Sequence, residues 1–152
     1  MSDSIPSPST NLSGTILAVD VGLKRCGLAI SDPQRRVAVG AGSLTIKDFK
    51  ELAEKITYEA QRRQVTTLLI SKPQPFSPSS RELSIKIESL AQALRKQTFL
   101  VILWNEAFTT AQALRERKFY GGRGKSQKKW VDEAAAVLLL QNYLDRIPRT
   151  NP

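Results

Sequence analysis

The stretch ILAVDVGLKRCGLAISD, residues 16–32, decides the fold because it predicts two strands joined by a tight turn. Residues 16–19 form an apolar run that is long enough for a buried strand and too short for a helix. Gly22 favours the turn because glycine adopts positive φ at little cost. Asp20 therefore ends a central strand, where its carboxylate is well placed to bind a metal ion. The alternative is that Asp20 only begins the turn, as aspartate often does.

The pattern beyond residue 32 predicts three further strands and several helices. The first three strands are too close in sequence for helical crossovers, so we expect an antiparallel meander. A helix before the fourth strand favours parallel pairing of that strand with the first. The expected fold class is α/β, a five-stranded mixed sheet with residues 16–19 at its centre and helices on both faces. The expected elements are a strand over 37–44, a helix over 47–63, a strand over 65–70, a loop over 71–80, a helix over 81–97, a strand over 99–104, a short helix from 109 or 110 to about 118, a basic loop over 120–129 and a helix from 126 or 127 to 146.

Composition limits the classes of protein. With 152 residues, 41% of them hydrophobic, the chain can form one domain with one core. We expect that domain over 15–147, between a disordered Pro/Ser-rich tail over 1–14 and a short tail over 148–152. One cysteine and no histidine exclude an internal disulfide, cysteine-based zinc sites and histidine acid–base catalysis. No apolar run approaches the roughly 20 residues that span a bilayer, so we expect a soluble cytoplasmic protein.

The charge of the chain indicates its partner. The formal net charge is +9, which favours binding to a polyanion, most often nucleic acid. Basic residues concentrate in the glycine-rich segment 115–129, for which we predict contacts to the phosphate backbone from Arg123, Lys125 and Lys128. A basic but inert surface and a merely solvated loop are the alternatives.

Three carboxylates occupy positions that could converge. Asp20 ends the first strand, Glu106 follows the fifth, and Asp132 lies in the first turns of the last helix. If the two strands open on the same edge of the sheet and the helix packs nearby, the three side chains meet. Their repulsion then requires a hard divalent cation, Mg²⁺ or Mn²⁺, which can support phosphodiester hydrolysis. The alternative is that Glu106 and Asp132 are helix N-terminal charges favoured by the dipole.

Three motifs together resemble the YqgF family, also called RuvX-like. They are DVGLKRCGLAISD, NEAFTT and VDEAAAVLLLQNYLD, and the resemblance spans residues 15–147. Members of that family are described as Holliday junction resolvases or pre-16S ribosomal RNA nucleases with a ribonuclease H-like fold. The resemblance implies that Asp20, Glu106 and Asp132 are catalytic and hold the metal. It also matches Lys24, Arg25, Thr109 and Thr110 to family motif positions, and we predict that these four residues contact nucleic acid.

The chain departs from the family pattern beside these acids. Asn105 stands where the family has aspartate, and Ala107 stands where it has arginine. Ser71, Lys72 and Pro73 replace the usual Gly-Leu-Pro after the fourth strand. The neutral amide and the missing cation leave open a weakened or altered activity.

Several functions remain open at this point. The favoured one is a metal-dependent nuclease, acting in 5′-end processing of pre-16S ribosomal RNA by resemblance, with four-way DNA junctions as the second substrate. A different class is a non-catalytic nucleic-acid-binding protein that keeps the acids for structure. Half of an actin-like ATPase is disfavoured, because 152 residues provide no second lobe to close over a nucleotide. The expected partner is structured RNA or branched DNA, without a membrane, for a monomer or homodimer.

Overall fold

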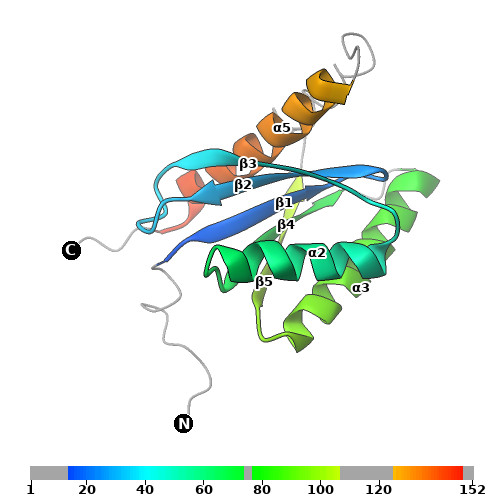
Figure 1. Ribbon diagram of the computed structural model, residues 1–152, viewed down its shortest axis with the longest axis horizontal. Coiled ribbons are helices and arrows are strands. Elements are labelled where there is room, and N and C mark those ends of the chain that lie inside the picture. Colours follow the sequence, from blue (N-terminus) through cyan, green and yellow to red (C-terminus); the bar gives the residue numbers. More distant parts are fainter. Residues whose placement is uncertain (1–13, 74–76, 107–124, 149–152) are drawn as a thin grey trace.

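The computed structural model describes residues 14–73, 77–106 and 125–148, which form a five-stranded sheet with α5 on one face and α2 and α3 on the other (Figure 1). This arrangement confirms the predicted mixed sheet with helices on both faces. The elements in chain order are β1 (Ile16–Val21), β2 (Arg25–Ser31), β3 (Ala38–Thr45), α2 (Phe49–Arg62), β4 (Thr67–Pro73), α3 (Pro78–Lys96), β5 (Leu100–Glu106) and α5 (Lys125–Arg146).

The strand order is β3-β2-β1-β4-β5, which confirms that β1 lies at the centre. β1 pairs antiparallel with β2 and β2 antiparallel with β3, as the short connections predicted. β1 pairs parallel with β4, and β4 parallel with β5. The carboxyl ends of β1, β4 and β5 therefore lie at one edge of the sheet, the carboxyl edge, which holds Val21, Pro73 and Glu106.

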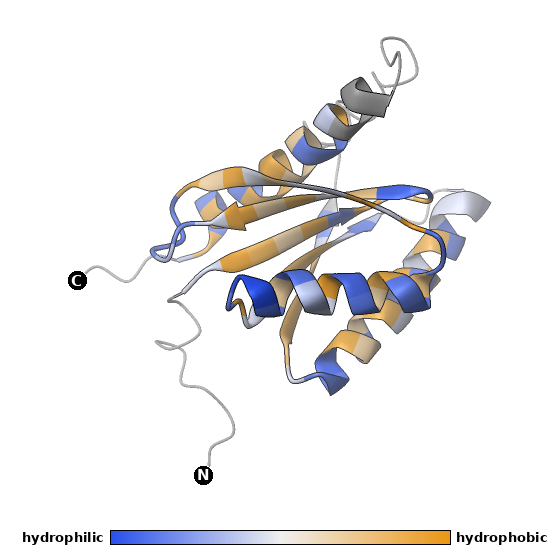
Figure 2. Cartoon of the chain, in the orientation of Figure 1, coloured by the Kyte–Doolittle hydropathy of each residue, from blue (hydrophilic) through white to orange (hydrophobic). Residues whose placement is uncertain are grey.

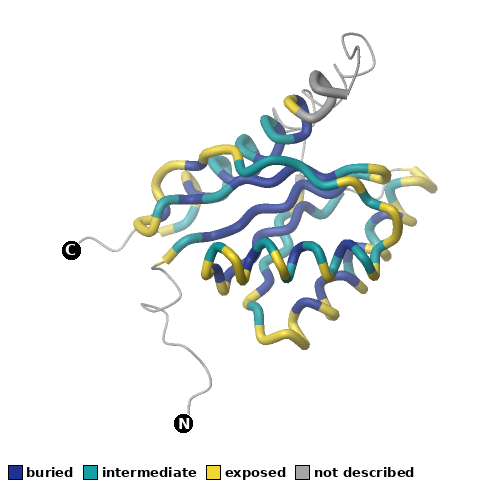
Figure 3. The backbone as a smooth tube through the Cα atoms, viewed as in Figure 1, coloured by how far each residue is buried: buried dark blue, intermediate teal, exposed yellow. Residues whose placement is uncertain are grey.

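Alternation along β1 divides the core into two layers. Leu17, Val19 and Val21 belong to the core that contains the buried residues of α2 and α3, whereas Ile16 and Ala18 belong to the core beneath α5. The central strands β1 and β4 are apolar and mostly buried, whereas β3 at the edge of the sheet is mostly intermediate or exposed (Figures 2 and 3). Because side chains alternate along a strand, Asp20 shares the α5 face with Ile16 and Ala18.

The start of α3 differs from the prediction of a loop over 71–80. Ser77 caps the helix: its hydroxyl accepts the backbone N–H of Ser80, and the Ser80 hydroxyl accepts the backbone N–H of Ser77. Pro78 occupies the first helical turn, where a missing N–H costs nothing. The serines and the proline therefore begin a helix at Pro78, and the prediction that this segment excludes regular structure was wrong.

Several strands extend past their predicted ends, and β1 continues beyond Asp20 to Val21. β4 extends to Pro73 and β5 to Glu106, because Lys72 pairs with Asn105 and Pro73 with Glu106. The acid expected just after the fifth strand is thus its last residue. The final helix begins at Lys125, so the end of the predicted basic loop is helical and includes Lys128.

Some predictions fall outside the described residues. They are the short helix from 109 or 110 to 118, the basic loop up to residue 124, the tail at 1–13 and the end of the chain at 149–152. Gly14 is described, and its N–H donates to the carbonyl of Pro33 at 2.9 Å. None of the helices within the described ranges has the apolar length needed to cross a bilayer.

Candidate active site

Asp20 lies at the carboxyl end of the most buried strand. Asp20 is 3% exposed and its Oδ1 atom is fully buried. In the sheet, Asp20 pairs with Gly27 of β2. The next residue, Val21, donates its N–H to the hydroxyl of Ser71 on β4 at 3.0 Å. This bond joins the ends of two neighbouring strands and holds Asp20 in place. The sequence did not predict the role of Ser71, although a serine directly after the apolar run of β4 was a signal.

Asp132 is brought to the same face by a close contact of α5 with β2. A Cβ atom on Gly27 would lie 1.8 Å from the carbonyl oxygen of Asp132, so the helix backbone rests directly on this glycine. Gly27 is also the residue that pairs with Asp20. Both acids therefore belong to residues that adjoin Gly27, and Asp132 is only 5% exposed.

Burial and the negative charges of both carboxylates raise the pKa of the Cys26 thiol. Burial and then the negative charge of Asp20 raise the pKa of Cys26 to about 12, with a smaller contribution from Asp132. Cys26 immediately precedes Gly27 in β2, so both acids influence the same short segment. The cysteine stays a neutral thiol at ordinary pH and is not a nucleophile.

Arg25 forms an ion pair with one of the two buried acids. Its Nε–H donates to Oδ2 of Asp132 at 2.7 Å, and the two side chains are 21% and 6% exposed. Such a pair offsets part of the cost of burying a carboxylate. Lys24 lies exposed in the turn before it. Nucleic-acid binding by Lys24 and Arg25 stays a prediction, and the structure adds that Arg25 also contacts Asp132.

Glu106 ends β5 at the same edge of the sheet, opposite Pro73 and two strands away from β1. Its side chain lies outside the described part of the chain. Within that part, no group of three or more His, Cys, Asp or Glu side chains gathers as a metal site would require. The structure thus places Asp20 and the backbone of Asp132 beside the same residue, Gly27, and puts the backbone of Glu106 at the same edge of the sheet. Buried carboxylate oxygens are the donors that Mg²⁺ and Mn²⁺ prefer, so the residues present fit such an ion.

The structure describes little of the other residues predicted to contact nucleic acid. Thr109, Thr110 and Arg123 lie outside the described residues, and Lys125 and Lys128 are helical residues whose side chains are not described. Asn105, the residue that departs from the family, is exposed on β5. Lys72 forms an ion pair with Glu88 of α3.

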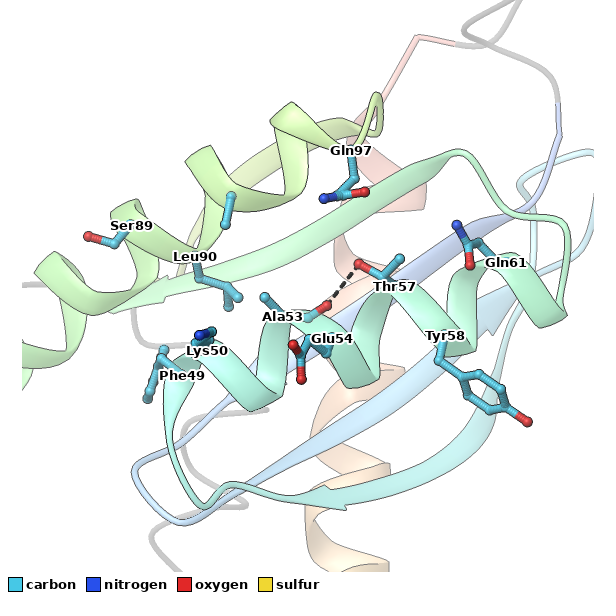
Figure 4. A pocket seen from close by; sticks show the side chains of 11 residues that line it. Phe49, Lys50, Ala53, Glu54, Thr57, Tyr58, Gln61, Ser89, Leu90 and Gln97 are labelled. Carbon is cyan, nitrogen blue, oxygen red and sulfur yellow. Dashed lines mark hydrogen bonds between the residues drawn. The ribbon is translucent and has the colours of Figure 1, made fainter.

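A separate groove lies between α2 and α3 and has a volume of about 570 Å³. Figure 4 shows it lined by Phe49, Ala53 and Tyr58 from α2 and by Leu90 and Gln97 from α3. It is on the face of the sheet opposite to α5, and Glu54 is the single carboxylate in its lining. This groove therefore does not belong to the candidate active site.

Comparison with known proteins agrees with the fold and with the family that the motifs resemble. Residues 14–146 match the RuvX family, which is described as "Holliday junction resolvase". A protein of Rhodopseudomonas palustris (strain BisA53), named "Putative pre-16S rRNA nuclease", is 31% identical over 140 residues, which cover 91% of this chain and 86% of the relative. A protein of Ruminiclostridium cellulolyticum with the same name is 34% identical over 140 residues, with 87% and 94% covered.

A solved structure, T. thermophilus RuvC in complex with Holliday junction substrate, superposes with a TM-score of 0.52 at 15% identity and covers 88% of this chain and 95% of that one. This likeness concerns the fold alone, and it confirms the expected ribonuclease H-like class. The described sheet and helices thus have a ribonuclease H-like fold. The chain belongs to the RuvX family, because the family match covers nearly all of it.

We predict that Gly27→Ala strongly destabilises the protein. The added methyl group would overlap the Asp132 carbonyl, and backbone atoms on both sides leave α5 no easy way to yield. Overpacking of this kind costs about 1–3 kcal/mol and occasionally more. The measurement is the free energy of unfolding in urea. A variant as stable as the wild type would contradict the close packing of α5 on β2.

Proposed function

We propose that this protein is a metal-dependent nuclease that hydrolyses phosphodiester bonds. The observation that carries the proposal is that two buried acids, Asp20 and Asp132, both adjoin Gly27, on which α5 rests. Buried acids on one face repel each other unless a cation lies between or beside them. Membership of the RuvX family and the net charge of +9 support a nucleic-acid substrate.

In this proposal Asp20, Glu106 and Asp132 hold Mg²⁺ or Mn²⁺. The bound ion supplies Lewis acidity toward the phosphate and lowers the pKa of a water molecule. The chain contributes a fixed frame: the Val21–Ser71 bond holds the end of β1, and the α5 contact holds Asp132. Arg25 neutralises Asp132 and is exposed enough to turn to a phosphate oxygen, to which a guanidinium binds well.

The favoured substrate is the 5′ region of pre-16S ribosomal RNA, because relatives that match most of the chain carry that name. The description of the family favours four-way DNA junctions as the second substrate. We place the activity in the cytoplasm, for a monomer or homodimer whose domain covers residues 15–147. Asn105 and Ala107 remove an acid and a cation from the family pattern, so we expect weaker activity than a member with both would have.

The first prediction concerns the three acids. Asp20→Asn, Glu106→Gln and Asp132→Asn should each reduce Mg²⁺- or Mn²⁺-dependent cleavage by about 100-fold or more, or roughly 3 kcal/mol of transition-state stabilisation. Cleavage is measured on a 5′-extended 16S precursor RNA and on a four-way DNA junction. Asp145→Asn is the matched control, because Asp145 is an exposed acid on the same helix, α5, and its amide can still accept the Gln141 hydrogen bond.

Two outcomes would contradict this proposal. If all variants cleave like the wild type, the three acids are not the catalytic site. If the wild type binds both nucleic acids but cleaves neither with either metal, the chain is a nucleic-acid-binding protein without catalysis. Preference for the RNA or the junction decides the substrate class.

The second prediction concerns the basic segment before and at the start of α5. Neutralising Arg123, Lys125 and Lys128 together should weaken binding at every salt concentration. If all three contact phosphates, the salt slope should flatten by about 2.7 on duplex DNA and about 2.1 on single strands. Binding is measured by fluorescence anisotropy over a salt series.

The matched control removes three exposed cations from the edge opposite the carboxyl edge. They are Arg36 between β2 and β3, Lys96 at the end of α3 and Arg146 at the end of α5. The control should change the slope much less. Equal slopes for the two triple variants would remove the basic segment from the binding surface.

A further inference from the structure

Glu133, the residue after Asp132, connects α5 to β3. Its Oε2 atom accepts the backbone N–H of Gly42 on β3 at 2.8 Å, across 91 positions of sequence. The carboxylate therefore satisfies a strand N–H at the place where the pairing of β2 with β3 is irregular. Neither the family motif nor the candidate site assigns Glu133 a role.

The backbone of β3 is irregular where the Glu133 side chain lies against it. The register between β2 and β3 shifts at Leu28 and Ala29, so that Leu28 pairs with Gly42 and Ala29 with Gly40. A Cβ atom on Gly40 would lie 2.5 Å from Oε2 of Glu133. Gly42 has φ of +100°, a conformation that other residues rarely adopt. Gly40 therefore leaves space for the Glu133 carboxylate, and Gly42 supplies the backbone N–H that it accepts.

The hydrogen bond between Gly42 and Glu133 holds α5 at the residue next to Asp132. Consecutive residues of a helix share one stiff backbone, so a contact at Glu133 limits the rotation of α5 that would move Asp132. The backbone of Asp132 rests on Gly27 of β2, and the bond from Gly42 holds the helix at β3. These two strands fix the tilt and rotation of α5 beside Asp20.

Gln141 makes the same kind of contact further along α5. Its Oε1 accepts the N–H of Ala38 at 3.0 Å, and its Nε2 donates to the carbonyl of Arg36 at 2.9 Å. It ties the helix to the beginning of β3, more than two turns away from Asp132. Gln141 is therefore a control for an anchor of α5 that lies at a distance from Asp132.

We propose that Glu133 is a positioning residue for the metal site. Its bond to Gly42 sets the rotation of α5 so that the carboxylates of Asp132 and Asp20 meet around one divalent cation. The inference rests on the proposed metal-dependent function. Glu133 is not itself proposed as a metal ligand, because its Oε2 atom accepts the backbone N–H of Gly42.

The test measures Mn²⁺ affinity of the full chain by isothermal titration calorimetry, with thermal unfolding recorded for each variant. Glu133→Ala and Glu133→Asp should weaken Mn²⁺ binding by about 10–100-fold, because alanine has no acceptor and the aspartate side chain is one methylene too short. Glu133→Gln should restore most of the affinity, because its amide oxygen still accepts the Gly42 N–H. Gln141→Ala should lower the melting temperature but leave Mn²⁺ affinity unchanged.

Three results would overturn the inference. They are Mn²⁺ affinity in Glu133→Ala equal to that of the wild type, a Glu133→Gln variant as weak as Glu133→Ala, or an equal loss in Gln141→Ala. The second result would mean that charge rather than the hydrogen bond acts, and the third that any anchor of α5 serves. Asp20→Asn distinguishes failure of this inference from failure of the proposed function. If Asp20→Asn binds Mn²⁺ as the wild type does, or if the wild type binds none, the proposed metal site itself is wrong.

Discussion

The close approach of α5 to β2 at Gly27 is the contact on which the candidate site depends. The helix can reach the sheet because a hydrogen atom stands where any other residue would place a methyl or larger group. Small residues on the same helix, Ala135 and Ala136, are fully buried and keep the two layers close. The approach has one main consequence, which is that Asp132 lies over the strand pair that carries Asp20.

This arrangement has an electrostatic cost. Two acids that are 3% and 5% exposed lie on one face of a mostly apolar layer, and burial of a carboxylate is unfavourable unless it is paired. Arg25 offsets part of the cost at Asp132, and the high pKa of Cys26 reflects burial and the remaining negative charge. A divalent cation would relieve the repulsion directly.

Much of the fold followed from local sequence. The apolar run at 16–19, the short connections and the helix before β4 were enough to predict the centre of the sheet, its mixed directions and the acid at the end of β1. Strand ends were predicted less well, because β5 reaches Glu106 only through pairing with β4, and spacing along one segment contains no such information. The cap at Ser77 was present in the sequence but was outweighed by the neighbouring prolines.

The candidate site was predictable in its acids and not in its supports. Asp20 and Asp132 could be chosen from strand and helix positions and from the family resemblance. The bonds of Glu133 to Gly42 and of Ser71 to Val21 join residues that are far apart in sequence, and no local pattern announces them. The contact of Arg25 with Asp132 could not be predicted for the same reason, because it crosses 107 positions. Tertiary packing determines these supports, so they became visible only in the folded chain.

The most direct measurement of the central claim is anomalous diffraction from crystals of the protein grown with Mn²⁺. The account predicts one strong peak within coordination distance, about 2–2.5 Å, of a carboxylate oxygen of Asp20 and of Asp132 together. The same crystals of Asp20→Asn should lose that peak or show it much weakened. A fully occupied ion elsewhere, with Asp20 and Asp132 both without a metal contact, would contradict the account.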